Sequence, residues 1–330
     1  MSDLPTKDAV KGSIVTVGDF VKAACGRIPL EVVVGGSSLD TVIEETILNR
    51  PGLALTGYFE NFAWKRVQII GNAEAAYLAS LSPNEQSMRF KALLAHNARV
   101  FVFTAGHTPS KTIISLAKKA KAVLLRTTVE TFEFSRHSIF VMESLAAPRT
   151  ALYGTMIEVC GLGVLFEGAP GMGKSETALG LIKRGCALIA DDLTCIRKDV
   201  ASNLLFASAS DTTAGFMEIR GIGIIDVMKV FGVNAIRGEK RLQLVITFKR
   251  LQDIAGEVDR TGQTRKVRNI LGVNVPNIII PVSEGRDLVN LVETAAQQHK
   301  LIQTGYNPVS VLSSRLHKRA GNQKSSKQKG

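Results

Sequence analysis

Apolar residues along the chain come in short runs separated by amphipathic stretches, a pattern typical of alternating strands and helices. In the first part of the chain, runs rich in Val, Ile, Leu and Phe predict strands at residues 30–34, 67–70, 100–104 and 122–125. Helical spacing predicts helices at residues 17–24, 83–95 and 110–120. Because this alternation is typical of layered α/β proteins, we assign residues 1–130 to an N-terminal α/β domain.

A helix is predicted next, because Phe134, Ile139 and Val141 follow helical spacing, and Pro148 ends the segment. We assign residues 131–148 to this helix, which connects two domains. Beyond it, strands are expected at residues 151–159, 164–166, 187–190, 193–197 and 241–248, and helices at residues 175–183, 227–233 and 288–303. The apolar run 273–282 contains two prolines, so an edge strand or a bent strand is expected there.

The chemistry of the second region centres on a phosphate-loop motif, G-x-x-x-x-G-K-[ST]. Its residues are Gly168, Ala169, Pro170, Gly171, Met172, Gly173, Lys174 and Ser175. An apolar strand precedes the motif and a helix follows it, as the motif requires. The glycines let backbone N–H groups point at phosphate oxygens, Lys174 can reach the β- and γ-phosphates, and Ser175 can offer its hydroxyl to Mg²⁺. We therefore assign residues 149–306 to a phosphate-loop domain that binds phosphate groups and Mg²⁺.

Acidic residues supply further candidates. Asp191 and Asp192 follow an apolar strand, where carboxylates suit a metal ligand and a general base. Glu218 and Arg220 lie between apolar residues, just before two glycines. Their spacing fits two interpretations equally well: a solvated ion pair at a strand end, or a metal-binding carboxylate with a phosphate-binding guanidinium. The charged segment 253–272 is expected to be a mobile loop or a hairpin.

Composition narrows the class of protein. The chain has 330 residues, of which 45% are hydrophobic, so it can bury sizeable cores. No apolar run approaches the roughly 18 residues of a membrane span, and the polar N-terminus favours the cytoplasm. The four cysteines are scattered without metal-ligand spacing and are expected to be reduced and buried.

The formal net charge is +12, and six basic residues lie in the last stretch of the chain. We expect residues 307–330 to form a disordered basic tail, which either aids solubility or contacts an acidic partner. A nucleic-acid-binding regulator is disfavoured, because no groove-reading motif is visible.

From about residue 13 to residue 306, the chain resembles the bifunctional HPr(Ser) kinase/phosphorylase family. The segments that carry the resemblance are NRPGL at residues 49–53, GKSETAL at 173–179, ADD at 190–192 and EIRGIGIIDV at 218–227. The resemblance implies ATP-dependent phosphorylation of a serine of the phosphocarrier protein HPr. It also implies phosphorolysis of that seryl phosphate by inorganic phosphate, with release of pyrophosphate. A catalytic core similar to that of phosphoenolpyruvate carboxykinase and a homohexamer are implied as well.

The resemblance also assigns roles to residues of this chain. Lys174 would neutralise phosphate charge, Ser175 and Glu218 would hold Mg²⁺, Asp191 would support the metal, and Asp192 would be the base. The EIRG segment implies a functional role for Arg220. Arg260 matches an active-site arginine in a flexible loop. The segment tied to the phosphorylase direction matches Pro281, Val282, Ser283, Glu284, Gly285 and Arg286.

Two residues depart from the family pattern. Tyr153 stands where the family has an active histidine, and Leu193 stands where arginine is expected. A phenol cannot replace imidazole as an acid–base group near neutral pH, so the dephosphorylating direction is expected to be weakened. The alternatives are a nucleotide-binding scaffold without transfer and a kinase for another acceptor.

Overall fold

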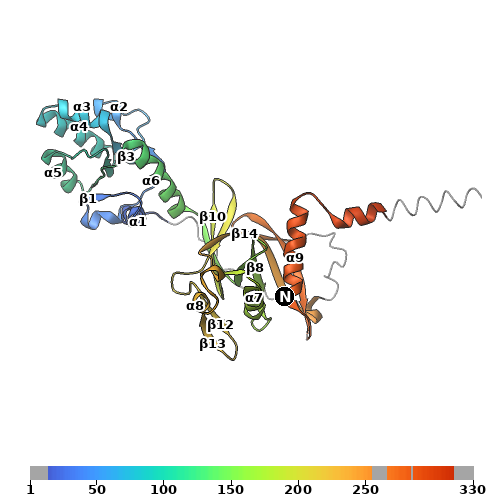
Figure 1. Ribbon diagram of the computed structural model, residues 1–330. Helices are drawn as coiled ribbons and strands as arrows, with labels where there is room; N and C mark the ends of the chain where they lie inside the picture. Colours follow the sequence, from blue (N-terminus) through green and yellow to red (C-terminus); the bar gives the residue numbers. More distant parts are fainter. Residues whose placement is uncertain (1–13, 255–265, 284, 316–330) are drawn as a thin grey trace, which may run out of the picture. The chain divides into compact units, whose positions relative to one another are not determined.

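The computed structural model describes residues 14–254, 266–283 and 285–315. The chain divides into two compact units, one spanning Gly12–Ala147 and the other including Pro148–Gly330 (Figure 1). Among the helices of the described ranges, none is long and apolar enough to cross a membrane. Arg260, Glu284 and residues 316–330 lie outside the described residues. The four cysteines are free; Cys25 is exposed and the other three are partly buried, so the expectation of buried thiols is wrong for Cys25.

The first unit is built on a five-stranded sheet with the strand order β1-β5-β4-β3-β2. The strands are β1 (Glu31–Val34), β2 (Leu48–Asn49), β3 (Val67–Ile70), β4 (Val100–Phe103) and β5 (Val123–Arg126). Strands β2 to β5 are parallel, whereas β1 runs antiparallel to β5. This mixed α/β architecture agrees with the fold class predicted from the alternating pattern.

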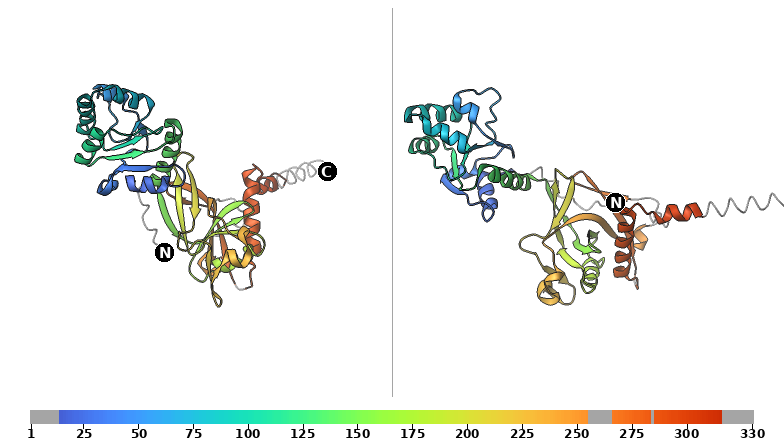
Figure 2. Two further views of the ribbon diagram at one scale, coloured as in Figure 1. Left: turned by 60° about the vertical axis from the view of Figure 1, so that its left-hand side comes forward. Right: turned by 45° about the horizontal axis from the view of Figure 1, so that its top comes forward.

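Helices cover both faces of this sheet, which explains why its central strand β4 is apolar throughout. The helices are α1 (Val17–Ala24), α2 (Gly52–Thr56), α3 (Asn72–Ser80), α4 (Pro83–Ala95), α5 (Lys111–Lys119) and α6 (Thr131–Ala146), with a 3₁₀ helix at Gly36–Asp40. Figure 2 shows helices on both sides of the sheet. One core contains residues of α1 and α6 together with Val100 and Val102 of β4, and a second core contains residues of α2, α3, α4 and α5 together with Phe101 and Phe103. Alternate residues of one strand thus enter opposite cores. Helix α6 packs within this unit, and its predicted role as the connector of two domains stays a prediction.

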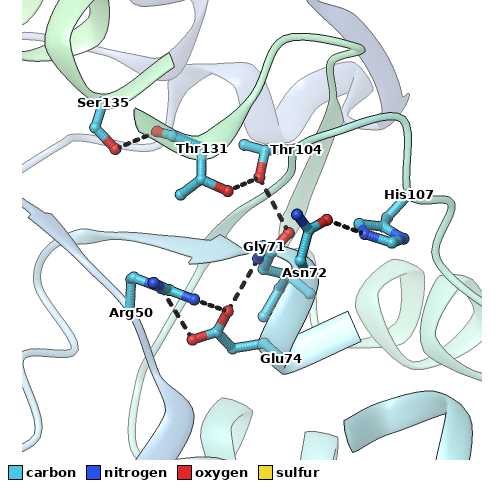
Figure 3. A network of polar contacts seen from close by, with 9 residues as sticks. Arg50, Gly71, Asn72, Glu74, Thr104, His107, Thr131 and Ser135 are labelled. Atoms are coloured by element: carbon cyan, nitrogen blue, oxygen red, sulfur yellow. Dashed lines mark hydrogen bonds and ion pairs between the residues drawn. The ribbon is translucent and has the colours of Figure 1, made fainter. Parts of the chain in front are cut away.

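A polar network lies at the carboxyl ends of the parallel strands (Figure 3). The Arg50 guanidinium, just after β2, donates to both carboxylate oxygens of Glu74 in α3, at 3.1 and 2.8 Å. Glu74 is 5% exposed and also accepts from the Gly71 amide at 3.1 Å. Thr104, after β4, shares a 2.7 Å hydrogen bond with Thr131 of α6. The network therefore ties together the loops that follow three neighbouring strands.

The second unit is built on a larger sheet with the strand order β6-β10-β11-β14-β8-β7-β9, in which β16 pairs with β14 and β15. Its strands are β6 (Arg149–Tyr153), β7 (Thr155–Val159), β8 (Leu162–Gly168), β9 (Ala187–Ala190), β10 (Leu193–Asp199), β11 (Leu204–Ser208), β14 (Glu239–Arg250), β15 (Lys266–Ile270) and β16 (Val273–Val282). The strands β12 (Phe216–Ile219) and β13 (Gly223–Asp226) form a separate hairpin next to α8 (Figure 1).

The helices of this unit are α7 (Lys174–Ile182), α8 (Val227–Phe231) and α9 (Leu288–Gln303), with 3₁₀ turns at Val233–Ala235 and Leu251–Ile254. Helices α7 and α9 and one face of the β12–β13 hairpin bury their apolar residues in a single core with β8 and β14. The opposite face of the sheet has its own core, which includes Leu152, Leu165 and Ile196. The phosphate-loop motif thus lies between a buried strand and a buried helix, as the sequence predicts.

Several sequence predictions match the structure residue by residue, among them the helices 83–95 and 288–303 and the strand 67–70. The single strand predicted at residues 151–159 is wrong, because it divides at Gly154 into β6, which pairs with β10, and β7, which pairs with β8 and β9. A Cβ at Gly154 would clash with the Phe166 carbonyl oxygen, so this crossing point requires glycine. Strand β11 was not predicted from the sequence.

The predicted disorder of residues 307–330 differs from the structure over residues 308–315, which are helical. Val309, Val311 and Leu312 make this part of the segment less polar than the residues after it, so a helix can form there.

Candidate active site

Strand directions bring the motifs together at one edge of the larger sheet. Strand β7 is antiparallel to both β8 and β9, so β8 and β9 run in the same direction. The phosphate loop follows β8, Asp191 follows β9, and the first residue of β7, Thr155, lies between them at the same edge. Ligands of α/β sheets bind at such carboxyl edges. The topology therefore assembles a site from three segments that are far apart in the sequence.

The phosphate loop turns sharply between β8 and α7. Gly173 caps α7 with a φ of 80°, in the left-handed region that favours glycine. Gly168 has a φ of 152°, and a Cβ there would lie 2.8 Å from the Phe248 carbonyl oxygen. The loop therefore needs glycine both for its conformation and for its close approach to β14. The N-terminal end of α7, with its free N–H groups, faces this loop.

Lys174 reaches back across the loop. Its Nζ donates to the carbonyl oxygens of Gly168 at 2.9 Å and Ala169 at 3.3 Å. The ammonium group is therefore held over the loop, where a phosphate group would compete with neutral carbonyl oxygens for it. Thr177 steadies the start of the helix by donating to the Gly173 carbonyl oxygen at 2.6 Å.

Asp191 is the centre of the polar contacts at this edge. Its Oδ1 accepts from the Thr155 hydroxyl at 2.7 Å and from the Ser175 hydroxyl at 3.1 Å. Its Oδ2 accepts from the Glu218 backbone amide at 3.3 Å. The side chain is 6% exposed, and no ion pair to it occurs among the described residues. Asp191 thus links the phosphate-loop serine, strand β7 and the β12–β13 hairpin.

Burial raises the pKa of Asp191 above its ordinary value, because an ionised carboxylate loses water there. The neighbouring charge of Asp192 raises it further, while hydrogen bonds from Thr155, Ser175 and the Glu218 amide act in the opposite direction. The site therefore holds a carboxylate whose charge is compensated by neutral donors rather than by a fixed cation. A bound cation would favour its ionised form.

Asp192 and Tyr153 lie where β6 pairs with β10, Asp192 just before β10 and Tyr153 at the end of β6. Asp192 has a φ of 60°, its backbone oxygen accepts from the Gly154 amide at 2.8 Å, and its side chain is exposed. Tyr153, at the end of β6, is 68% exposed and is the register partner of Leu193. Tyr153 and Leu193 are therefore cross-strand neighbours, and Leu193 directly follows Asp192 in the chain.

Glu218 and Arg220 belong to the β12–β13 hairpin. Glu218 is in β12 and is exposed, while its backbone amide contacts Asp191. Arg220 lies exposed in the turn after β12. No ion pair between the two side chains occurs among the described contacts, so the structure gives no support to the interpretation as a strand-end pair.

Part of the segment at residues 281–286 lies at the same edge of the sheet, at the end of another parallel strand. Strands β8, β14 and β16 are parallel, with Gly168 opposite Phe248 and Phe248 opposite Ile280. Pro281 and Val282 end β16, and Ser283, Gly285 and Arg286 lie between β16 and α9. The structure thus places the described part of this segment two strands from the phosphate loop, with β14 between them.

Thr155 was missed by the sequence reading. It is fully buried and makes the shortest hydrogen bond to Asp191. The available signal was a hydroxyl residue opening an apolar run directly after a glycine, and hydroxyl residues are common in strands for other reasons.

Oxygen donors that suit Mg²⁺ are present on three segments: the Ser175 hydroxyl and the Asp191 and Glu218 carboxylates. Within the described ranges, no group of three or more His, Cys, Asp and Glu side chains could hold a metal alone. Mg²⁺ sites of phosphate-handling enzymes typically use one or two carboxylates together with substrate phosphates, so this donor set fits that ion.

Comparison with known proteins gives consistent results for both units. Residues 15–142 match the family described as HPr Serine kinase N terminus, and residues 144–316 match the HPr Serine kinase C-terminal domain. An HPr kinase/phosphorylase of Leptospira biflexa is 38% identical over 291 residues, covering 88% of this chain and 90% of that protein. One from Caldicellulosiruptor bescii is 39% identical over 305 residues, covering 92% and 96%. A solved structure, the Hpr(Ser) kinase/phosphatase from Coxiella burnetii, is 33% identical, covering 51% of this chain and 98% of its own, with a TM-score of 0.45.

Proposed function

This chain belongs to the HPr serine kinase family, and from that premise we propose that it transfers the γ-phosphate of ATP to a serine of HPr. We propose that it also runs the reverse phosphorolysis, in which inorganic phosphate takes the phosphoryl group and pyrophosphate is released. The chain is accordingly a protein kinase/phosphorylase enzyme. The observation that carries the proposal is the contact between the phosphate-loop Ser175 and the buried Asp191.

The phosphate loop would hold the nucleotide. Backbone N–H groups at the start of α7 and the Lys174 ammonium face the space above the loop, where negative charge is stabilised. When phosphate oxygens arrive, Lys174 would exchange its bonds to the Gly168 and Ala169 carbonyls for charge-assisted bonds to phosphate. Positioning and electrostatic stabilisation of this kind supply most of the catalysis in phosphoryl transfer.

Ser175, Asp191 and Glu218 would hold Mg²⁺, with hydroxyl and carboxylate oxygens as ligands. When bound, the ion supplies charge neutralisation on the transferring phosphate. Asp191 is already oriented for this role by Thr155 and by the Glu218 amide. Burial disfavours the ionised form of this carboxylate, and a bound cation would stabilise that form.

The proton is handled by Asp192. Its exposed carboxylate would accept the seryl proton as the oxygen attacks the γ-phosphate, and would return a proton to the serine in the reverse direction. Arg220 would balance phosphate charge from the hairpin turn, and we assign a similar role to Arg260. The segment Pro281, Val282, Ser283, Glu284, Gly285 and Arg286 would serve the phosphorolysis direction.

Tyr153 should weaken one direction. It cannot carry positive charge near neutral pH, and it pairs with Leu193, the residue that follows the proposed base. Tyr153→His should therefore raise the phosphorolysis rate more than the kinase rate. Equal changes, or no change in either rate, would contradict this role.

We also propose a catalytic core similar to that of phosphoenolpyruvate carboxykinase, a cytoplasmic location and assembly as a homohexamer. A nucleotide-binding scaffold without transfer is the second candidate, and Tyr153 is the residue that favours it.

The test is seryl phosphorylation of HPr from the same organism, followed by intact mass with ATP and Mg²⁺. The proposal predicts a phosphate-sized mass gain that Lys174→Ala abolishes. Subsequent addition of inorganic phosphate should remove the gain and release pyrophosphate. Bound ATP without any mass gain on HPr would overturn the kinase proposal in favour of the scaffold or of another acceptor.

A further inference from the structure

The β12–β13 hairpin exposes apolar side chains beside the proposed metal ligands. Ile224 is 76% exposed and Ile222 is 71% exposed, while Phe216 on the same hairpin is 45% exposed. By contrast, Met217 and Ile219 are almost fully buried in the core shared with α7 and α9. One face of the hairpin therefore anchors it, and the other face offers apolar surface to solvent.

The strand register places this surface next to the chemistry. Glu218 and Ile224 are direct cross-strand partners, and such partners project from the same face of a hairpin. The amide of Glu218 binds Asp191, so the hairpin is fixed against the active edge of the sheet. Ile224 thus lies on the same face as a proposed metal ligand. Exposed apolar surface that continues into a polar site is typical of an interaction surface.

We propose that the face carrying Ile222 and Ile224 is the docking surface for the protein acceptor, which presents apolar side chains next to its reactive serine. This inference rests on the proposed kinase function and names how that site selects its substrate. Phosphate groups and Mg²⁺ gain nothing from contact with isoleucine, whereas a protein surface does. Continuity with Glu218 places the acceptor serine close to the phosphate loop. Arg220, in the turn between the two strands, adds a positive charge that favours an acceptor with an acidic group at its rim.

The hairpin is built so that this surface stays exposed. Gly221 and Gly223 have φ values of 84° and 97°, and they flank Ile222 in the turn. The Ile222 amide donates to the Ile219 carbonyl oxygen at 3.0 Å, which closes the turn. The tip is therefore held in a defined conformation, and its apolar side chain has little freedom to fold back into the core.

The experiment compares Ile222→Ser, Ile224→Ser and the double variant with Val200→Ser. Val200 is similarly exposed, at 67%, but it lies beyond the far end of β10 from Asp192, about 20 Å away by strand length. The measurements are the KM for HPr, the KM for ATP and kcat at saturating HPr. Light scattering on a sizing column gives the oligomer mass, and thermal unfolding checks that each variant is folded.

The double variant is expected to raise the KM for HPr about tenfold, equivalent to about 1.4 kcal/mol. The KM for ATP, kcat and the oligomer mass should stay within twofold of the wild type, and Val200→Ser should change none of these values. An unchanged KM for HPr would overturn the inference, as would an equal effect in Val200→Ser. A raised KM for ATP would assign the face to the nucleotide, and a changed oligomer mass would assign it to contacts between copies of this chain. Absence of transfer by the wild type would overturn the kinase proposal itself, which separates the two failures.

Discussion

Glu74 and Asp191 are both buried carboxylates at the carboxyl edge of a sheet, but their partners differ in charge. Glu74 is 5% exposed and is bound by both arms of the Arg50 guanidinium. Asp191 is 6% exposed and is bound by two hydroxyls and one backbone amide. The hydrogen bond with Glu74 raises the pKa of Arg50, whereas burial raises the pKa of Asp191. The first carboxylate has a resident counterion and the second has none among its described partners.

The difference separates a structural role from a chemical one. A buried charge that is paired and fully hydrogen-bonded holds loops in place, as Arg50 and Glu74 do for the ends of β2 and β3. A buried carboxylate supported by neutral donors is oriented but not neutralised, so it can attract a cation from solution. Buried carboxylates of the second kind, with a shifted pKa, are candidates for active-site roles.

The largest expected effect is on the Asp191 side of the comparison. Asp191→Asn keeps the shape and removes the charge, so phosphoryl transfer to HPr should fall at least about 100-fold. Initial rates with ATP and Mg²⁺ measure this loss. Asp199→Asn is the matched control, because Asp199 is a partly exposed carboxylate at the far end of β10, and its rate should stay within twofold. Equal rates for the two variants would contradict the assignment of Asp191 to the active site.

On the Glu74 side, the expected effect is on stability. Arg50→Met leaves the buried Glu74 carboxylate without its guanidinium partner and should destabilise the first unit by about 2–3 kcal/mol. The chain has one tryptophan, Trp64, which packs in that unit, so its fluorescence during urea unfolding reports on this unit.

A control for Arg50→Met is Arg136→Met, which breaks a 3.6 Å pair with Glu133 in which both side chains are about 60% exposed. It should cost less than about 0.5 kcal/mol. Equal losses in the two variants would show that burial of Glu74 has no structural consequence.

A third prediction concerns pH in the metal-free protein. Because the folded-state pKa of Asp191 is raised, folding binds its proton more tightly than the unfolded chain does. Its contribution to stability is therefore fully present at low pH and is lost as pH rises through the folded-state pKa. The free energy of unfolding of the wild type, relative to that of Asp191→Asn, should decrease as pH rises from about 4 to 7. An increase in this free-energy difference over the same pH range would mean that folding lowers the pKa of Asp191.

The smallest effect should come from Thr155. Thr155→Val removes one of the three donors to Asp191 and should raise the Mg²⁺ concentration for half-maximal rate about tenfold. Thr155→Ser, which keeps the hydroxyl, should behave as the wild type does. An equal change in both variants would point to packing of the methyl group instead of to the hydrogen bond.

Much of the fold could be predicted from pattern alone. Helix α4 has a proline at its start and a capping box between Ser82 and Glu85, which fix where it begins. Strand β3 has Val67 and Ile69 in one core and Ile70 in the other, so its apolar residues mark its two ends, although Gln68 between them is also buried. The division at Gly154 could not be predicted, because it depends on how closely the chain passes the Phe166 carbonyl oxygen, a contact between strands.

The candidate site divides in the same way. The spacing of glycine, lysine and serine in the phosphate loop predicts phosphate binding, so the local sequence is enough to identify Lys174 and Ser175. The convergence of Thr155 and Glu218 on Asp191 depends on the antiparallel position of β7 and on the hairpin register, which are set by pairings far apart in the chain. The same pairings bring the Glu218 amide to Asp191, whereas the roles of the Glu218 and Arg220 side chains stay predictions.

The most direct test of the contrast is binding of Mn²⁺, a paramagnetic substitute for Mg²⁺, in the presence of ADP, followed by electron paramagnetic resonance. The wild type and Arg50→Met should bind one tight ion per chain, and Asp191→Asn should lose that site while it remains folded. Tight binding that persists in Asp191→Asn, or that disappears in folded Arg50→Met, would contradict the assignment of a chemical role to one carboxylate and a structural role to the other.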